Sequence, residues 1–320
     1  MIPRPDLESP MPHRTDDIVL ELPSIRLTIS PSVGASIVSL EHRDARGRWA
    51  HILRQMPKDS LDASDAGSFL MLPWTNRVKN ARFRFGGAEH TLVANHSDGT
   101  AIHGIAREQA WSIVDRSPIT ARLTLRHEPD GTCPFAFGGV ARYEIAPERV
   151  ELDLSVTNLG AEPMPAGCGH HPYFHRHLSS DADDLRVKMG VSGRYETTAC
   201  IPSGSVIDDD ACALLRSGKP IGNPGLDDVF AGFGGRVVMD WPQSGVRLTM
   251  DCSPELGHMV VYTPRDSDGS PSEFVCIEPV SMVNDGFNLL EQGMDQTGVR
   301  VLGPGETLRT RTVFEFSSIG

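Results

Sequence analysis

Apolar and polar residues alternate with a period of two along much of the chain. Residues 150–156 read Val-Glu-Leu-Asp-Leu-Ser-Val, and residues 246–251 read Val-Arg-Leu-Thr-Met-Asp. Such alternation predicts antiparallel strands that bury one face and expose the other. Shorter segments with the same pattern lie at 83–85, 123–125, 141–145 and 313–316.

Turn-forming residues separate these segments. Pairs such as Gly86-Gly87 and Asp98-Gly99 are typical of hairpins, and 31 Gly with 24 Pro leave little room for long helices. We therefore predict an all-β protein built as one large antiparallel β-sandwich. Its longest and least regular connections are expected near residues 51–75 and 179–225. The periodicity does not distinguish a sandwich from a barrel or a jelly roll.

The charge of the chain argues against several classes of partner. Its 42 acidic and 30 basic residues give a formal net charge of −12, and no Lys/Arg-rich run offsets it. A nucleic-acid or anionic-membrane partner is therefore disfavoured. No stretch approaches the ~20 apolar residues that a membrane-spanning helix needs.

Cysteine usage and the N-terminal sequence favour a cytoplasmic location. The six cysteines are scattered, without the close pairs of zinc or redox sites, and the N-terminus has no apolar run of signal-peptide type. Residues 1–16, rich in Pro and charge, are predicted to form a mobile tail ahead of a single domain over residues 17–320. Without an interface signature, the expectation is a monomer or a homodimer.

Two early segments carry side chains suited to a polar ligand. Asn76-Arg77 follows Trp74 and precedes a predicted strand, and the planar guanidinium of Arg77 is suited to holding ligand oxygens. A surface arginine stacked on Trp74 explains Arg77 equally well. His103 precedes Gly104 among apolar residues, a setting more typical of a core histidine than of a ligand-binding one.

Four histidines lie within eight residues, in the segment Gly169-His170-His171-Pro172-Tyr173-Phe174-His175-Arg176-His177. In an extended chain His171, His175 and His177 share one face, whereas His170 lies on the other. Pro172 interrupts a strand ladder, and the nearby Gly and Pro residues exclude a helical metal-binding motif. We therefore predict no metal site, and expect one or two of these histidines to point into a cleft.

Two acidic residues occur in segments of different character. Asp227 precedes Asp228 in a Gly/Pro-rich stretch, where an Asp pair is commonly a turn or a cap. Alternatively, one carboxylate accepts hydrogen bonds from two adjacent ligand hydroxyls. Glu278 ends an apolar strand, where an unpaired carboxylate is costly to bury. Burial raises the pKa of such a group and makes it a competent base, whereas a solvent-facing Glu278 is the alternative.

Taken in order, these segments resemble the aldose 1-epimerase (galactose mutarotase-like) family. The most specific matches are His171-Pro172-Tyr173-Phe174, and Glu278-Pro279 followed by Asn284-Asp285-Gly286-Phe287-Asn288. Further matches are Asn76-Arg77, His103-Gly104 with Trp111, Leu226-Asp227, and Leu302 to Glu306. Together they extend from residue 73 to about residue 316, nearly the whole presumed domain.

The resemblance implies a large twisted antiparallel β-sandwich that binds a small-molecule sugar in an open cleft on one concave sheet face, with no cofactor. It assigns Glu278 as the base at the anomeric hydroxyl and His171 as the acid at the ring oxygen. His103 becomes a hydrogen-bonding partner near the reacting centre. Arg77 and Asp227 become ligands of the sugar hydroxyls, with Asn76 beside them.

The chain departs from the family pattern at three positions. Val280 stands where galactose mutarotases usually carry Gln, which indicates a broader bacterial branch and weakens an assignment to galactose. Asn80 stands where Gly often precedes the Phe strand, and Asn tolerates the left-handed conformation. His170 replaces an aromatic or apolar residue. Three readings of His170 stay open: it tunes the pKa of His171, contacts substrate, or faces solvent.

We therefore hypothesise a mutarotase that interconverts the α and β anomers of a free aldose by ring opening and closure. A Glu/His pair suits this reaction near neutral pH, because one group removes the anomeric proton while the other protonates the ring oxygen. Two alternatives remain. One is a non-catalytic sugar-binding or sensing protein on the same fold. The other is an epimerase of a sugar phosphate, which needs a basic cluster drawn from Arg77, Arg107, Arg176 and Arg265.

Overall fold

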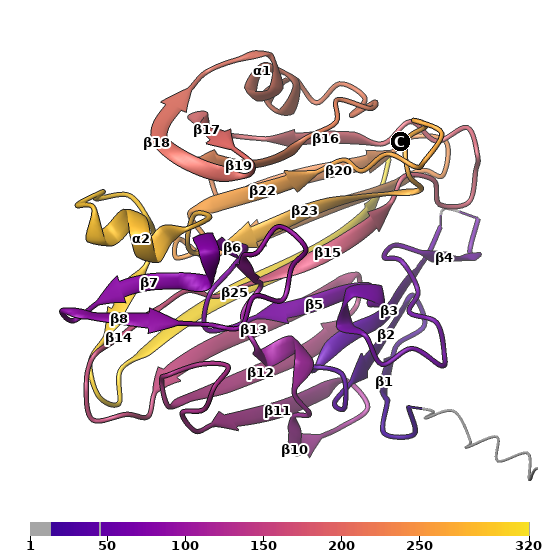
Figure 1. Ribbon diagram of the computed structural model, residues 1–320. Coiled ribbons are helices and arrows are strands. Elements are labelled where there is room, and N and C mark those ends of the chain that lie inside the picture. Colours follow the sequence, from indigo (N-terminus) through magenta and orange to yellow (C-terminus); the bar gives the residue numbers. More distant parts are fainter. Residues whose placement is uncertain (1–13, 45, 320) are drawn as a thin grey trace, which may run out of the picture.

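The computed structural model describes residues 14–44 and 46–319, and it consists mostly of antiparallel strands arranged in two large sheets that pack face to face (Figure 1). This confirms the all-β sandwich predicted from the sequence. Residues 1–13 of the expected tail lie outside the described residues. Residues 14–16 are described, and Arg14 Nη1 donates hydrogen bonds to the carbonyl oxygens of Pro57 and Ser60.

Within the described residues, eleven strands form the first sheet. Ten of them follow one path, and β4 (Trp49–His51) adds to β3. In spatial order the path is β1 (Ile18–Glu21), β2 (Ile25–Ser30), β3 (Ser36–Arg43), β5 (Ser68–Met71), β15 (Gly169–His175), β23 (Phe274–Val280), β22 (His258–Tyr262), β19 (Asp227–Ala231), β17 (Gly193–Thr198) and β18 (Ile201–Ile207).

The second sheet contains eight strands in the part of the chain that the structure describes. Their spatial order is β10 (Ser112–Arg116), β11 (Thr120–His127), β12 (Phe137–Ala146), β13 (Arg149–Asn158), β25 (Thr307–Ser318), β21 (Val246–Cys252), β20 (Arg236–Trp241) and β16 (Arg186–Met189). The alternating segments found in the sequence form the middle of this sheet. Along β13, for example, Val150, Leu152, Leu154 and Val156 are buried between the sheets.

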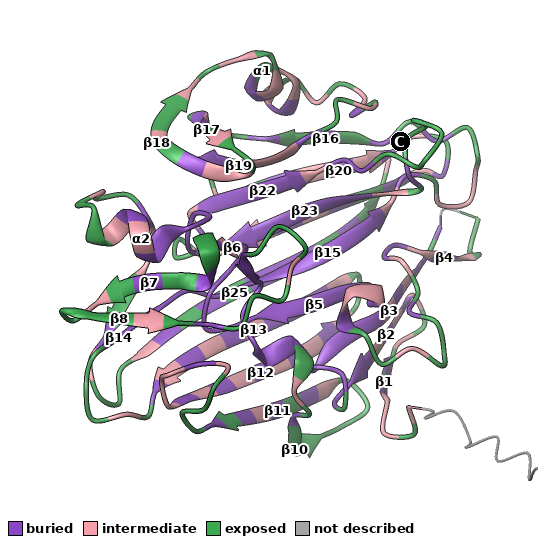
Figure 2. Cartoon of the chain, viewed as in Figure 1, coloured by how far each residue is buried: buried purple, intermediate pink, exposed green. Residues whose placement is uncertain are grey.

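Three central strands of the first sheet, β5, β15 and β23, are buried over almost their whole length (Figure 2). Their inner faces contribute to the main core between the sheets. Their outer faces support a second, smaller apolar cluster that includes Phe69, Tyr173 and Val280. Because segments from elsewhere in the chain cover this outer face, polar side chains placed there are largely removed from water.

Short elements complete the fold. Paired strands outside the two large sheets are β6 (Arg77–Val78) with β9 (Ala101–Ile102), β7 (Arg82–Phe85) with β8 (Ala88–Thr91), and β14 (Met164–Ala166) with β24 (Arg300–Leu302). The helices are α1 (Asp210–Ser217), α2 (Gly286–Glu291) and the 3₁₀ turns η1 (Ala63–Asp65), η2 (Lys79–Ala81) and η3 (Ala106–Glu108). None of the helices in the described ranges has the length and apolar character needed to cross a membrane.

The turn predictions are confirmed, but the predicted irregular connections are wrong in part. Gly86-Gly87 joins β7 to β8 with both glycines at positive φ, and Asn80 adopts a left-handed conformation with φ 54°. However, residues 51–75 contain the central strand β5, and residues 179–225 contain β16, β17, β18 and α1. Strand β5 is buried on both faces, so its sequence, Ser-Phe-Leu-Met, shows no alternation.

Candidate active site

The outer face of the first sheet carries two neighbouring rows of side chains across its central strands. The strand pairings place Phe69, His171, Glu278 and Val260 at one level of β5, β15, β23 and β22. The next level holds Tyr173, Cys276, Tyr262 and Asp227 on β15, β23, β22 and β19. Residues far apart in the sequence thereby form the floor of one cavity.

All six residues singled out from the sequence line this cavity: Asn76, Arg77, His103, His171, Asp227 and Glu278. The cavity has a volume of about 290 Å³. The remaining lining residues are Ser64, Phe69, Asn95, His96, Ile102, Arg107, Tyr173 and Tyr262. None of these eight is predicted from the sequence to be a site residue, although Arg107 is one of the cations considered for a phosphate-binding cluster.

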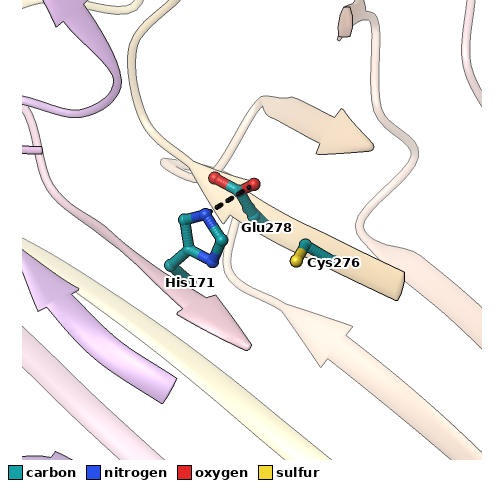
Figure 3. Close-up of side chains that lie close together, drawn as sticks. All are labelled: His171, Cys276 and Glu278. Atoms are coloured by element: carbon teal, nitrogen blue, oxygen red, sulfur yellow. Dashed lines mark ion pairs between the residues drawn. The ribbon is translucent and has the colours of Figure 1, made fainter. Parts of the chain in front are cut away.

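His171 and Glu278 face each other across adjacent strands. Gly169 pairs with Val280 and Tyr173 with Cys276, which places His171 opposite Glu278. His171 Nε2 lies 3.1 Å from Glu278 Oε1 (Figure 3). Both residues are buried, with exposed fractions of 6% and 1%. Their other polar atoms, His171 Nδ1 and Glu278 Oε2, are buried without a hydrogen-bond partner in the protein.

Burial shifts the two pKa values in opposite directions. It raises the pKa of Glu278 well above its usual range, and the nearby charge of Asp227 raises it further. Burial lowers the pKa of His171 well below its usual range, and the cation Arg107 adds to this effect. Both shifts favour the uncharged form of each group, a protonated carboxyl on Glu278 and a neutral imidazole on His171.

Aromatic and imidazole rings enclose His171. The ring centroid of Phe69 lies 4.6 Å from that of His171, and the centroid of Tyr173 lies at 4.5 Å, both with stacked geometry. The His103 ring meets His171 edge-on at 5.1 Å. Two guanidinium groups lie over the flanking rings, Arg107 over Phe69 and Arg54 over Tyr173. These contacts restrict rotation of the imidazole ring and so fix the positions of its two nitrogen atoms.

His103 reaches the cavity because of an unusual backbone conformation. Its φ is +64°, and that of Gly104 is +68°. A Cβ at position 104 would lie 1.9 Å from the carbonyl oxygen of Leu72, so only glycine fits. The His103 Nδ1 lies 3.0 Å from the sulfur of Met71, and burial lowers the pKa of the ring, with His171 the next largest cause. A neutral His103 that donates from Nδ1 presents Nε2 as an acceptor.

Arg77 and Asp227, which line the cavity, form a charged group with Asp98. Arg77 Nε donates to Asp98 Oδ2 at 2.9 Å, and Arg77 Nη2 lies 3.6 Å from Asp227 Oδ2. Asn76 Oδ1 accepts from the backbone N–H and from Nη1 of Arg77. The guanidinium is thus held on three sides, while Asp227 remains 36% exposed at its side chain.

The Asn-Asp-Gly-Phe-Asn segment after β23 supports this charged group rather than lining the cavity. The Asp285 N–H donates to the carbonyl oxygen of Arg77 at 2.6 Å, and Asp285 Oδ1 accepts from the Lys79 N–H at 2.8 Å. Asn284 Nδ2 donates to the carbonyl oxygen of Cys200 at 3.0 Å. This segment therefore fixes the position of β6, which carries Arg77.

His170 faces the core between the sheets, opposite to His171. Its ring nitrogens contact the hydroxyl oxygens of Ser68 at 3.3 Å and Thr312 at 3.1 Å, and burial lowers its pKa to about 3. This placement rules out two of the open readings, contact with a ligand in the cavity and exposure to solvent. Trp74 is also buried, which contradicts a surface arginine stacked on it.

His171, Cys276 and Glu278 also satisfy the spacing of a metal site, because one potential ligand atom from each lies within 4.8 Å of the others. However, burial raises the pKa of the Cys276 thiol well above its usual range, and Glu278 raises it further. The thiolate that a metal prefers is therefore disfavoured. The expectation that the protein uses no metal stays a prediction.

Comparisons with known proteins agree on one family. The sequence profile of the family described as "Aldose 1-epimerase" matches residues 17–315. The uncharacterized proteins YphB and YihR of Escherichia coli (strain K12) are 27% and 28% identical to the chain. Those alignments cover 78% and 82% of this chain, and 83% and 85% of the two relatives. The solved structure of a galactose mutarotase-like protein from Clostridium acetobutylicum superposes with a TM-score of 0.81 at 19% identity, covering 95% of each chain.

Proposed function

The chain belongs to the aldose 1-epimerase family, and we propose that it interconverts the α and β anomers of a free aldose. The observation that carries this proposal is the buried contact between His171 and Glu278, 3.1 Å apart on the floor of a polar cavity. General acid–base catalysis needs two such groups within reach of the same reacting centre.

In the proposed reaction, the proton shared by the pair first moves from Glu278 to His171, across the 3.1 Å contact. Glu278 then removes the proton of the anomeric hydroxyl while His171 donates its proton to the ring oxygen. The C1–O5 bond then breaks to give the open-chain aldehyde. Rotation about C1–C2 presents the other carbonyl face, and the ring closes with both proton transfers reversed. Protons balance over the cycle, because each group returns to its initial state.

Four residues are proposed to bind the sugar. Asp227 accepts hydrogen bonds from hydroxyls, and the fork of Arg77 donates to sugar oxygens. His103 lies edge-on to His171 and is placed to contact the oxygens of the reacting centre. Asn76 holds Arg77 through its Oδ1, which leaves its amide N–H groups for the ligand. The cavity volume of about 290 Å³ is near the lower limit of small-molecule sites, which favours a single monosaccharide.

Anomer exchange in freshly dissolved sugars tests the proposal directly. We expect the protein to accelerate the relaxation of at least one sugar in a panel of hexoses and pentoses at neutral pH, as measured by polarimetry or by NMR exchange. A non-catalytic sugar-binding protein predicts saturable binding without acceleration. Background relaxation rates across the whole panel would therefore reject the enzyme and favour that alternative.

The pH dependence of the reaction is expected to show a broad plateau around neutral pH. Activity needs the state in which His171 and Glu278 share one proton. The lowered pKa of His171 places the loss of activity in acid well below the usual range of histidine. The raised pKa of Glu278 places the loss in alkali well above the usual range of glutamate. Because the two groups titrate as a coupled pair, the acid and alkaline limits of activity give apparent pKa values of the pair rather than of either residue alone.

This profile is measured as kcat/KM between pH 4 and pH 10, after subtraction of the spontaneous relaxation of the sugar. An acid limb at the ordinary pKa of a solvent-exposed histidine would contradict the buried pair. So would an alkaline limb at the ordinary pKa of a glutamate.

A phosphorylated substrate is the second candidate, and the position of Arg107 favours it. Arg107 lines the cavity and is buried, with Nη1 bonded to Ser64 Oγ and Nη2 3.6 Å from the exposed Glu108. Arg176 and Arg265 lie elsewhere, and their guanidinium groups donate to the carbonyl oxygens of Gly222 and Asn223. A competition assay, in which a hexose or its 6-phosphate inhibits anomer exchange of a second sugar, distinguishes a free aldose from a sugar phosphate as the substrate. Stronger inhibition by the phosphate would favour the charged substrate.

A further inference from the structure

The turn between β17 and β18 brings Cys200 next to Asp227, which lines the cavity. The two turn residues, Ala199 and Cys200, have φ values of +49° and +61°. Residues with a side chain disfavour this left-handed conformation, and such two-residue hairpin turns usually contain Asn, Asp or Gly. A strained conformation at this point indicates that the surrounding contacts hold the turn in place.

Two hydrogen bonds connect the segment after β23, the strand that carries Glu278, to the carboxylate of Asp227. Asn284, just after β23, is 2% exposed, and its Nδ2 donates to the Cys200 carbonyl oxygen at 3.0 Å. The Cys200 thiol in turn donates to Asp227 Oδ2 at 3.2 Å. Asn284 therefore fixes the backbone from which the thiol reaches Asp227.

Arg77 approaches the same carboxylate oxygen of Asp227. Arg77 Nη2 lies 3.6 Å from Oδ2, the atom that the Cys200 thiol also contacts. With Oδ2 held from two sides, Oδ1 is the oxygen left for a ligand hydroxyl. Two partners on one oxygen also fix the plane of the carboxylate, which one partner alone does not.

We propose that Cys200 is a positioning residue for substrate binding, because its thiol holds the Asp227 carboxylate in the orientation that receives the sugar hydroxyls. This inference rests on the proposed function, in which Asp227 is a ligand of the sugar. Burial raises the pKa of the Cys200 thiol to about 11, and the charge of Asp227 adds to the shift. The group is therefore a protonated donor at neutral pH and a poor nucleophile.

The test compares Cys200→Ala with Cys200→Ser in anomer exchange. Alanine removes the donor, so we expect KM to rise by about three- to tenfold with kcat nearly unchanged. Serine retains a donor at the same position, so its KM should stay close to that of the wild type. Cys252→Ala is the matched control, because Cys252 is also half-buried but lies on β21 of the second sheet. Its KM should not change.

A double-mutant cycle with Asp227→Asn separates positioning from a general effect on the turn. If the thiol acts through the Asp227 carboxylate, Cys200→Ala should have little further effect once Asp227 is replaced. Additive effects would overturn the proposal. So would equal losses in the Ala and Ser variants, because these would trace the effect to packing rather than to the donor.

Equilibrium binding keeps this inference distinguishable from the proposed function. The dissociation constants of D-glucose and D-galactose are measured by NMR titration in a Glu278→Gln background, where no turnover is expected. Weaker binding on adding Cys200→Ala supports the positioning role even if the wild type fails to accelerate exchange. Unchanged binding overturns that role even if exchange is rapid.

Discussion

Replacement of Glu278 by Gln is expected to slow anomer exchange by on the order of 10²–10⁴-fold while leaving the fold intact. Glutamine has the shape of the protonated carboxyl group but cannot accept the anomeric proton. The side chain is buried and lies beside a His171 of lowered pKa, so a neutral amide is tolerated there. The loss should appear in kcat, because the residues proposed to bind the sugar are unchanged.

Glu273→Gln provides the matched control. Glu273 immediately precedes β23 but lines a different cavity, formed with Arg176 and Asp266. We expect wild-type exchange rates from this variant, measured by polarimetry together with the melting temperature. Equal activity of Glu278→Gln and the wild type would reject Glu278 as the base. Loss of activity with a collapsed melting temperature would show that the carboxylate is needed for folding instead.

Gly104→Ala is expected to cause a large loss of stability. The added Cβ would lie 1.9 Å from the Leu72 carbonyl oxygen, at a residue with φ of +68°. Backbone strain of roughly 1–2 kcal/mol adds to an overpacking cost of roughly 1–3 kcal/mol, so the free energy of unfolding should fall by about 2–5 kcal/mol. Urea unfolding measures this change.

Gly99→Ala isolates the contribution of the contact. Gly99 has a similar φ of +81°, but its added Cβ would meet nothing within 4 Å. This variant should lose only about 1–2 kcal/mol from the backbone conformation. Equal decreases in the free energy of unfolding of the two variants would mean that the close approach to Leu72 does not destabilise Gly104→Ala. We also expect Gly104→Ala to lower the exchange rate, because the displaced backbone carries His103.

The sequence predicts the fold well where one face of a strand is buried and the other meets solvent. Strands β13 and β21 are of this kind, because their alternation reflects a single buried face. Strand β5 is buried on both faces, so its sequence shows no alternation that would predict it. The hairpin of β17 and β18 is not predicted either, because its turn, Ala199-Cys200, contains none of the residues that normally mark such turns.

The candidate site likewise contains residues that the sequence identifies and residues that it does not. Residues with reactive or charged side chains, such as Glu278 and His171, can be identified from residue type and neighbouring sequence. Their partners cannot, because the strand pairings that place Phe69 beside His171 and Tyr262 beside Asp227 are long-range. The opposite orientations of His170 and His171 follow from strand geometry, but which of them faces the cavity depends on the sheet as a whole.

The two groups of site residues stand on supports of unequal rigidity. His171 and Glu278 lie on neighbouring central strands with partners on both sides, whereas Arg77, His103 and Cys200 come from a two-residue strand and two connecting turns. Under the proposed function, changes in these short connections would alter selectivity during evolution while the reaction itself is preserved. To change the preference of the proposed enzyme for one sugar over another, an engineer would vary these connections and leave the central strands β15 and β23 unchanged.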